Sequence, residues 1–593
     1  MNNVNNVQFD LFGWDTVQGI SFSEVNRAIE TLGSTPKDFD YKFYKNNDPK
    51  TNDLRRSING EWSPWKLTLS GDGKILSLQC PIKSGSFYMK TVDGGINLDF
   101  ANGDYVNIEV RLEYINSSQI THQDPTSKPN TGQQKDLIVK NTSDDQHVNA
   151  VSITGYNFSS FTDENSYGDS LIAKSTCKGS FESWFNNKEN LEKFKHVFAT
   201  ISVNTTANKG QFQWLKPTDV SYAVSTAEDL DKSIFGILCM TENRTASQYH
   251  EIDHRLLENI NGNSAFGIQS DRFLEKWILP GLLAMLPGTT PDDYELDGLS
   301  YTNKNQIRWG TFKNEDGDTV PATIDSKKLM LGLYGNNIRF DVVDLRWEAR
   351  DGITVHVNYT ESYKLELKSG IDKNGKPYKN IVTAKPVYDK PVLTMSYTVS
   401  DALKYKELFT SIGVAIVGAI VGGAIGGLAD GIGAAVSKSI GEVAGAGERA
   451  TVELTEFVTP EAISIGERTA IDQGLEGEIT AIDDLIEQGA TSTEMLNAIA
   501  TKPTSFWQRL VNNKWKTLGS IIGGVVGAAA GSTWQIIDSL AQENFSDLPT
   551  LDEFTANCVE TVKWPDNSGF ELQSVSLSDG GFRLGGKLTK TSE

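Results

Sequence analysis

Cysteine and histidine are scarce in this chain, which restricts the metal and redox chemistry open to it. The 593 residues include only four cysteines and six histidines. The cysteines are far apart and match no metal-ligand spacing, so we expect buried or free thiols at these positions. They are Cys80, Cys177, Cys239 and Cys558.

Basic residues are also fewer than acidic residues. The chain has 55 lysines and arginines against 77 aspartates and glutamates, a formal net charge of −22 and an isoelectric point near 4.8. A nucleic-acid-binding protein needs basic surface to neutralise phosphates, so this composition argues against a nucleic-acid partner. Any contact with an anionic membrane would have to be local, because the field of the whole chain repels such a surface.

The N-terminus lacks the features of a classical secretory signal. Residues 1–15, MNNVNNVQFDLFGWD, contain no basic segment followed by an apolar core. We therefore expect a protein made in the bacterial cytosol, with release by lysis or by an unconventional route left open. The chain is too long for one ordinary hydrophobic core, and we expect two to four domains or lobes.

Long uncharged stretches are rare here. Two occur, from Ser411 to Ala429 and from Leu518 to Thr533, and they lie in runs rich in glycine and alanine, residues 411–436 and 518–533. Glycines recur every four residues in both, and on a helix this spacing gives a stripe along which two helices can pack closely. We expect a helical hairpin, either packed within the soluble protein or entering a membrane. The glycines that we expect at this packing or membrane surface are Gly418, Gly422, Gly426, Gly519, Gly523 and Gly527.

Most of the remaining sequence has the period of β-strands. Apolar and polar residues alternate after residue 60, around residues 106–112 and again over residues 329–367. Asn374 and Gly375 form a dipeptide that favours a tight hairpin turn. These patterns predict a chain dominated by antiparallel strands.

Helical patterns are fewer. Ser21 and Glu24 have capping-box spacing before an apolar-periodic segment, which predicts one short helix. Residues 243–263 and 270–285 also show helical periodicity. Residues 405–545 are predicted to be a helical insertion rich in glycine and alanine, placed within the β-rich body.

One segment matches a zinc-protease motif. His250, Glu251 and His254 form HExxH, which on a helix would place two imidazoles on one face beside a general base, and Glu275 follows at a distance suited to a third ligand. Asp253 departs from the uncharged interior usual in this motif, and the surroundings of Glu275 lack a second-ligand signature. We therefore expect no metal and interpret the three motif residues as a solvated helix face, with zinc protease activity as a distant alternative.

Several aromatic landmarks resemble those of the clostridial P-forty-seven and OrfX-like proteins. The resemblance covers roughly residues 8–410 and, more weakly, the tail after residue 545. It is carried by the segments Phe12 to Val17, the Trp62 and Trp65 pair leading to Leu78 to Ile82, Phe212 to Pro217 followed by Tyr222, and Phe273 to Pro280.

The resemblance implies a fold, which we expect to be α+β and β-dominated. Members of this family belong to the tubular lipid-binding (TULIP) superfamily, in which elongated, highly curved antiparallel sheets wrap helices and an apolar groove can hold a lipid tail. We expect TULIP-like lobes at residues 1–225 and 226–404. The helical insertion would follow at 405–545, and strands at 546–593 would complete the second lobe.

The resemblance also implies a function. Such proteins are encoded beside bacterial toxins, and the family offers neither catalytic residues nor a cofactor to transfer. We therefore expect a non-enzymatic lipid-binding protein of a bacterial toxin system that is released as part of a toxin complex, with an insecticidal system as one option. Its expected partners are a lipid or other apolar ligand, a membrane surface and a toxin-component protein. The alternative is a membrane-inserting, pore-forming toxin that uses the glycine-rich hairpin.

Overall fold

A computed structural model describes fifteen stretches of the chain. These are residues 8–92, 94–116, 134–141, 149–161, 170–202, 210–286, 288–313, 319–350, 353–371, 377–387, 392–399, 451–457, 558, 562–565 and 568–590. Both glycine-rich runs lie outside them, so the predicted helical hairpin is not part of this description. Among the described residues, no helix has the length and apolar character that crossing a bilayer requires.

The chain divides into two compact units. The N-terminal unit comprises Val7–Gln269, Thr555–Ser574 and Arg583–Glu593, and the second unit comprises Met1–Asn6, Ser270–Phe554 and Val575–Phe582. The four domains predicted from the sequence, with limits at residues 225, 404 and 545, stay predictions.

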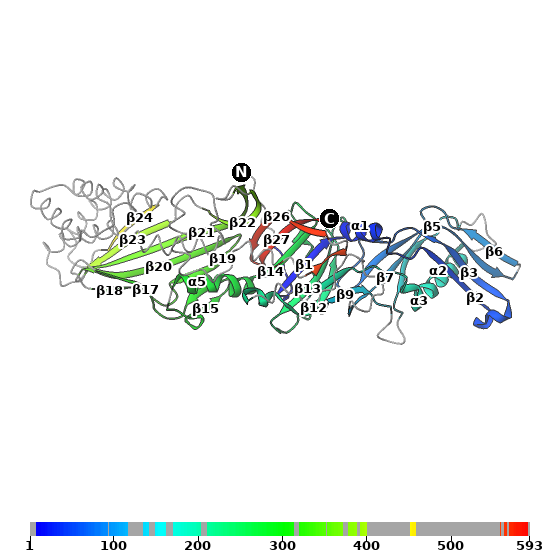
Figure 1. Ribbon diagram of the computed structural model, residues 1–593, viewed down its shortest axis with the longest axis horizontal. Coiled ribbons are helices and arrows are strands. Elements are labelled where there is room, and N and C mark those ends of the chain that lie inside the picture. Colours follow the sequence, from blue (N-terminus) through cyan, green and yellow to red (C-terminus); the bar gives the residue numbers. More distant parts are fainter. Residues whose placement is uncertain are drawn as a thin grey trace, which may run out of the picture. The chain divides into compact units, whose positions relative to one another are not determined.

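The fold is α+β and β-dominated, as predicted. The described residues form four sheets, and every strand pairing with an assigned register is antiparallel. Helices are few, and Figure 1 shows them beside the sheets rather than between parallel strands. The period-two sequence patterns therefore identified the fold class correctly.

A six-stranded sheet has the order β12-β13-β1-β14-β27-β26. Its strand β13, second from one edge, is buried along its whole length because it is covered on both faces. Phe235 and Ile237 join one hydrophobic core, whereas Leu238 and Met240 join another, as alternation along a strand requires. The strands are β12 (Pro217–Ser225), β13 (Ile234–Thr241), β1 (Thr16–Ser21), β14 (Ser264–Gln269), β27 (Gly581–Lys590) and β26 (Ser568–Ser578).

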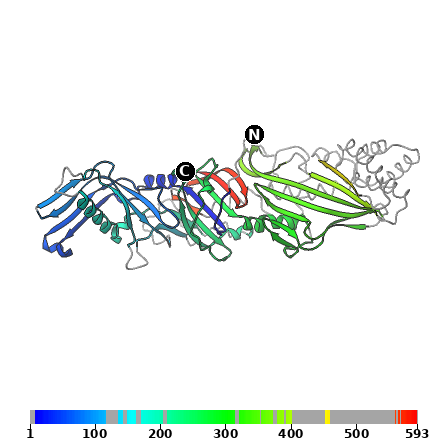
Figure 2. The same cartoon turned by 180° about the vertical axis from the view of Figure 1, so that it is seen from behind.

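A seven-stranded sheet of the N-terminal unit has the order β10-β7-β5-β3-β2, and β4 and β6 also pair with β5. Its long strand β5 pairs with β7 over its first part and with β3 and β6 over its second part. Figures 1 and 2 show helix α2 (Ser170–Phe185) lying along this sheet, where it contacts β2, β3, β5 and β10. The strands are β10 (Ser152–Asn157), β7 (Tyr105–Val110), β5 (Leu76–Thr91), β3 (Leu54–Trp62), β2 (Asp38–Tyr44), β4 (Lys66–Leu67) and β6 (Gly94–Asp99).

A four-stranded sheet, β25-β11-β9-β8, completes the strand structure of this unit. Its strands are β25 (Val562–Lys563), β11 (Ala199–Ser202), β9 (Gln134–Val139) and β8 (Leu112–Asn116). Helix α1 (Phe22–Leu32) confirms the predicted capping signal, because the Ser21 hydroxyl accepts the N–H of Glu24 and Gly33 ends the helix in a left-handed conformation. The remaining helices of the unit are α3 (Lys188–Leu191) and the 3-10 turns η1 (Lys45–Asn47), η2 (Pro49–Thr51), η5 (Gly210–Leu215) and η6 (His254–Leu257).

The second unit contains a ten-stranded sheet, in the order β15-β16-β19-β20-β21-β23-β24, with β17, β18 and β22 paired beside this path. The helical pattern of residues 270–285 is confirmed, as α4 (Ser270–Phe273), the π-helix η7 (Leu274–Ile278) and α5 (Leu279–Met285). A 3-10 turn, η8 (Pro291–Asp293), precedes the first strand. The strands are β15 (Tyr294–Asp297), β16 (Ser300–Asn303), β17 (Ile307–Lys313), β18 (Thr319–Ile324), β19 (Leu329–Tyr334), β20 (Asn337–Arg350), β21 (Ile353–Ile371), β22 (Pro377–Pro386), β23 (Val392–Val399) and β24 (Thr451–Phe457).

Two secondary-structure predictions were wrong. Residues 243–263 form a loop and one 3-10 turn instead of an α-helix. Within the predicted helical insertion, residues 451–457 form β24, which pairs with β23. Their sequence, TVELTEF, alternates apolar and polar residues and contains β-branched side chains, so it suits a strand at the edge of a sheet.

Candidate functional site

The HExxH segment is a loop rather than the predicted helix face. Residues 250–253 have no regular structure, and η6 begins at the second histidine. Nδ1 of His250 lies 3.1 Å from the Ser221 hydroxyl, and Nδ1 of His254 lies 3.5 Å from the Ser225 hydroxyl. These serines are four residues apart on β12, about 13 Å along an extended strand, so the two imidazoles are held at different points of the sheet.

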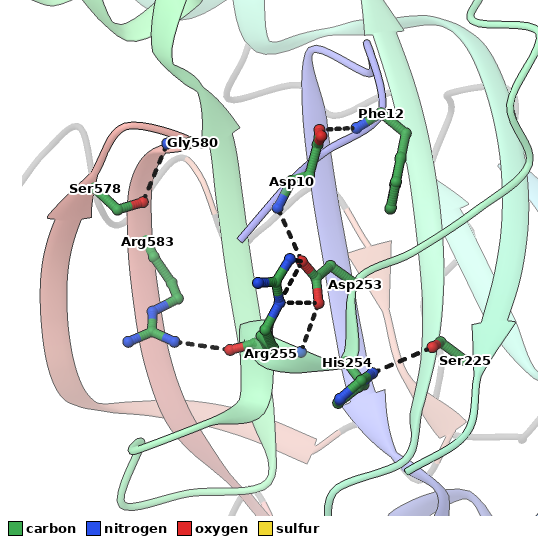
Figure 3. A network of polar contacts seen from close by, with 9 residues as sticks. All are labelled: Asp10, Phe12, Ser225, Asp253, His254, Arg255, Ser578, Gly580 and Arg583. Atoms are coloured by element: carbon green, nitrogen blue, oxygen red, sulfur yellow. Dashed lines mark hydrogen bonds and ion pairs between the residues drawn. The ribbon is translucent and has the colours of Figure 1, made fainter. Parts of the chain in front are cut away.

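Asp253 organises this loop (Figure 3). Its buried carboxylate accepts the backbone N–H of Asp10 at 3.0 Å and that of Arg255 at 2.9 Å, which caps η6. The guanidinium of Arg255 donates to the same carboxylate at 2.7–3.0 Å. The charge inside the HExxH motif therefore serves to fix the loop against the N-terminal segment.

The other parts of a zinc site do not assemble around the motif. Glu251 is exposed, and Glu275 forms ion pairs with Arg272 at 2.6 Å and with Lys276 at 3.0 Å. The described stretches contain no group of three His, Cys, Asp or Glu side chains that could hold a metal ion. His250, Glu251 and His254 thus have structural partners or solvent rather than a common ligand.

A group of aromatic side chains from α2, the seven-stranded sheet and the adjoining loops packs together in the N-terminal unit. We call it the aromatic interior. Trp62 is at its centre, with ring centroids 4.5 Å from Phe39, 5.4 Å from Phe181 and 5.6 Å from Trp184. Its members, all buried, are Phe39, Trp62, Trp65, Phe100, Phe158, Phe161, Phe181, Trp184, Phe185 and Phe194.

Three tryptophans of the aromatic interior bury an indole N–H group that makes no hydrogen bond with a described residue. They are Trp62, Trp65 and Trp184, and within the described part of the chain the same holds for Trp564 of the same hydrophobic core. A buried tryptophan normally finds an acceptor, as Trp14 does at the carbonyl of Tyr249, 2.7 Å away. Three unpaired donors on neighbouring rings form a polar feature in an otherwise apolar region.

His196 adjoins the aromatic interior. Its ring centroid lies 6.3 Å from that of Phe194 and 4.8 Å from that of Phe198, and its Nδ1 lies 2.8 Å from the Ser34 hydroxyl. Complete burial lowers the pKa of His196 from 6.5 to about 3, so the ring is neutral at physiological pH. This histidine therefore adds no charge to the apolar region.

The second unit also buries a polar group in its sheet. Tyr359, Glu361 and Tyr363 alternate along β21, so their side chains share one face, and all three are buried. The Tyr359 hydroxyl donates to Glu361 Oε2 at 2.5 Å, and Tyr363 donates a second hydrogen bond. Burial raises the pKa of Glu361 above its ordinary value of 4.5, while the two phenols act in the opposite direction.

The sequence identified only part of this arrangement. Trp62 and Trp65 were recognised as landmarks, but Trp184 was missed, although the aromatic spacing of FESWF at residues 181–185 offered a signal. The six predicted glycine positions, Gly418, Gly422, Gly426, Gly519, Gly523 and Gly527, lie outside the described residues. Their predicted role in packing or membrane contact stays a prediction.

Comparison with known proteins yields one family and several relatives. OrfX3 of Paraclostridium bifermentans is 29% identical over 306 residues, which cover 49% of this chain and 58% of that protein. OrfX3 of Clostridium botulinum strain Kyoto, type A2, is 27% identical over 402 residues, which cover 63% of this chain and 76% of that protein. The solved structure of P47 from Clostridium botulinum A2 aligns over 98% of both chains with 14% identity and a TM-score of 0.48.

The family model has the description "OrfX-like: Protein OrfX2/OrfX3/P47". It matches residues 11–505, which is more than half of the chain and includes most of both units. The family expected from the aromatic landmarks is therefore confirmed. This protein is a member of the OrfX-like family.

Proposed function

We propose that this protein is a non-enzymatic, lipid-binding component of a bacterial toxin system. The observation that carries the lipid-binding part is the set of three buried, unpaired indole N–H donors in the aromatic interior. Membership of the OrfX-like family supports the association with toxins, because the resemblance described above implies that role. We propose that it is made in the cytosol and released with a partner protein of the toxin complex.

The aromatic interior has the chemistry that a lipid tail and its ester group would need. Aromatic rings offer apolar contact area to an acyl chain, and an ester carbonyl oxygen is an acceptor for an indole N–H. An unpaired buried donor costs about 1–3 kcal/mol, so a ligand that supplies an acceptor removes this penalty. The proposed ligand therefore has an acyl chain that packs beside α2 and a carbonyl close to Trp62, Trp65 and Trp184.

Native mass spectrometry combined with lipid extraction tests this proposal on the full chain. We expect co-purified lipid in the wild-type protein and less of it in the double variant Trp62→Phe, Trp184→Phe, which keeps aromatic rings but removes two donors. Trp14→Phe is the matched control. It also removes a buried indole from the N-terminal unit, but one whose N–H already bonds to Tyr249.

Two results would count against this reading. The first is a wild-type protein that carries no lipid and takes none up from added vesicles. The second is equal lipid content in the double variant and in Trp14→Phe, because the indole donors would then have no part in binding. Stability provides a further check: without a ligand, only Trp14→Phe breaks a hydrogen bond, at a cost of about 1 kcal/mol.

Membrane insertion by the glycine-rich runs is the second candidate function, and the glycine spacing of residues 411–436 and 518–533 favours it. Dye release from liposomes, measured at neutral and at low pH, separates it from lipid binding. We expect no release by the wild-type protein. If release occurs and Gly422→Leu or Gly523→Leu abolishes it while the β-sheets stay folded, insertion is the better account.

A further inference from the structure

The pairing of β11 with β25 brings a distant part of the sequence to the hydrophobic core of the N-terminal unit. The two strands are antiparallel, and Thr200 is opposite Lys563. The residues that precede β11 therefore lie at the same end of this strand pair as the residue that follows β25. His196 comes before β11 and Trp564 comes after β25, so both belong to this end of the pair.

A row of packed rings connects these two residues. The ring centroid of His196 lies 4.8 Å from that of Phe198. Phe235 lies between Phe198 and Trp564, with centroid distances of 5.6 Å and 6.1 Å. His196 is 0% exposed and Trp564 is 5% exposed, so the whole row is part of the core and water does not reach its polar atoms.

Each of these two residues buries a nitrogen that has no partner among the described residues. The atoms are Nε1 of Trp564 and Nε2 of His196. We assign the tautomer of the histidine from the Ser34 hydroxyl, which lies 2.8 Å from Nδ1 but 3.4 Å from the carbonyl of Ile29. That carbonyl already accepts the backbone N–H groups of Gly33 and Ser34. The hydroxyl therefore donates to Nδ1, and Nε2 carries a hydrogen, as the indole nitrogen does.

The core thus contains two groups of unpaired donors. The first comprises the three indole N–H groups of the aromatic interior. The second, which we call the second donor group, comprises Nε2–H of His196 and Nε1–H of Trp564. One ring separates the two groups, because the centroid of Phe194 lies 5.0 Å from that of Trp65 and 6.3 Å from that of His196. A ligand that satisfies both groups needs two acceptors a short distance apart.

We infer that the ligand of this core is an uncharged lipid with at least two ester carbonyls, of the diacylglycerol class. One carbonyl accepts from the indoles of the aromatic interior and the other from the second donor group, while the acyl chains pack against the rings. Esters on neighbouring carbons of glycerol place their carbonyls a few bonds apart, as donor groups separated by one ring require. The inference rests on the proposed lipid-binding function and adds a second polar subsite to it.

The donors also determine which lipids are excluded. An amine brings further donors and, at physiological pH, a positive charge, so it leaves the five buried N–H groups unpaired. A carboxylate accepts hydrogen bonds, but its charge would be buried beside neutral donors, because burial lowers the pKa of His196 to about 3. Burying an uncompensated charge costs far more than burying an ester. An ester therefore matches these donors better than an acid or an amine.

Native mass spectrometry of the full chain, titrated with defined probes, tests the inference. The probes are dioleoylglycerol, with two carbonyls, oleyl oleate, with one, and the dioleyl ether of glycerol, with none. We expect the wild type to bind dioleoylglycerol at least about tenfold more tightly than the ether, because only the ester supplies carbonyl acceptors to the buried donors. Oleyl oleate should lie between them, and oleic acid, the anionic probe, should bind more weakly than dioleoylglycerol.

Two variants remove donors of the second group and keep a ring. Trp564→Phe should reduce the preference for dioleoylglycerol over the ether by about fivefold to tenfold, and His196→Phe should act in the same direction. The ratio of the two affinities is the readout, because a loss of packing affects both probes alike. Trp14→Phe is the matched control and should keep the wild-type ratio, since its indole N–H bonds to the carbonyl of Tyr249. Thermal denaturation of each variant shows whether it is folded.

Three results would overturn the inference. They are equal affinity of the wild type for dioleoylglycerol and the ether, tighter binding of oleic acid than of dioleoylglycerol, or a preference that Trp564→Phe and His196→Phe both leave unchanged. The proposed function fails separately. If the double variant Trp62→Phe, Trp184→Phe loses lipid while the second-group variants behave as the wild type, only the second donor group is contradicted. A wild-type protein that binds none of the probes and carries no lipid contradicts both.

Discussion

Arg583 donates from Nη1 to the backbone carbonyl of Glu258 at 2.9 Å, a contact between residues 325 positions apart in the chain. The same nitrogen donates to the carbonyl of Arg255 at 3.0 Å, just inside η6. The side chain of Arg583 is buried, whereas Arg255 and Glu258 are exposed residues of the loop that it holds. A strand from the end of the sequence therefore closes the loop that carries the HExxH segment (Figure 3).

Replacing Arg583 by methionine should destabilise the N-terminal unit by about 2–4 kcal/mol. The substitution keeps much of the apolar side chain but removes the charged donor that binds the carbonyls of Arg255 and Glu258. Urea unfolding followed by tryptophan fluorescence measures the effect. Arg27→Met is the control, since its partly exposed ion pair with Glu24, within one helix, should be worth less than about 1 kcal/mol. Equal losses in both variants would contradict the structural role of Arg583.

Gly85→Ala should destabilise the protein by about 2–4 kcal/mol. A Cβ atom at Gly85 would lie 2.2 Å from the carbonyl oxygen of Asn59 and 2.6 Å from Cα of Gly60, and backbone cannot move aside as a side chain can. Its φ of +143° adds conformational strain. Gly94→Ala separates the two causes, because Gly94 has a φ of +140° but no atom within 4 Å of the added methyl. Thermal unfolding should therefore show a clearly smaller loss for Gly94→Ala.

The strands were predictable because each one is a local pattern. The alternation of residues 329–367 is visible in the sequence, and the structure places β19, β20 and β21 there. The loop at residues 243–263 was not predictable in this way. Ile252, Leu256 and Leu257 have helical spacing, but the loop that buries them is fixed by Asp253 through Asp10, 243 positions away. Local periodicity contains no information about such a partner.

The candidate site was harder to predict than the fold. Trp62 and Trp65 stand out in the sequence, but nothing local indicates that their N–H groups lack acceptors. That property depends on where the backbone carbonyls of other strands point.

Glu361→Gln should change how the stability of the second unit depends on pH. Burial raises the pKa of Glu361 in the folded state, so the unfolded state loses its proton first as the pH rises above 4.5. The wild type should therefore lose stability from about pH 4.5 up to the folded-state pKa, and the glutamine variant should not. At pH 7 the variant should be at least as stable as the wild type. Urea midpoints between pH 4 and 8 measure this difference.

Tyr359→Phe provides a second test of the titration of Glu361. Its hydroxyl donates to Glu361 and lowers the pKa of that carboxyl, so its removal should extend the loss of stability to higher pH. If the stability of Tyr359→Phe depends on pH as that of the wild type does, Glu361 does not titrate as proposed. The same conclusion follows if Glu361→Gln keeps the wild-type slope of stability against pH.

His196 should make the N-terminal unit less stable at acidic pH. Burial lowers its pKa to about 3 in the folded state, whereas the unfolded chain has a value near 6.5. As the pH falls below 6.5, the unfolded state binds a proton at this histidine and the folded state does not, so the free energy of unfolding declines until the pH approaches 3.

His196→Phe should reduce the number of protons taken up on unfolding in this pH range by about one. The phenyl ring should keep the contacts with Phe194 and Phe198. Unfolding free energies at pH 7.5, 6.0, 5.0 and 4.5 give the slope for each protein. His254→Phe, which replaces a histidine outside the aromatic interior, is the control substitution. If wild type and His196→Phe have the same slope while both stay folded, His196 is protonated without cost and its environment is more polar than its burial indicates.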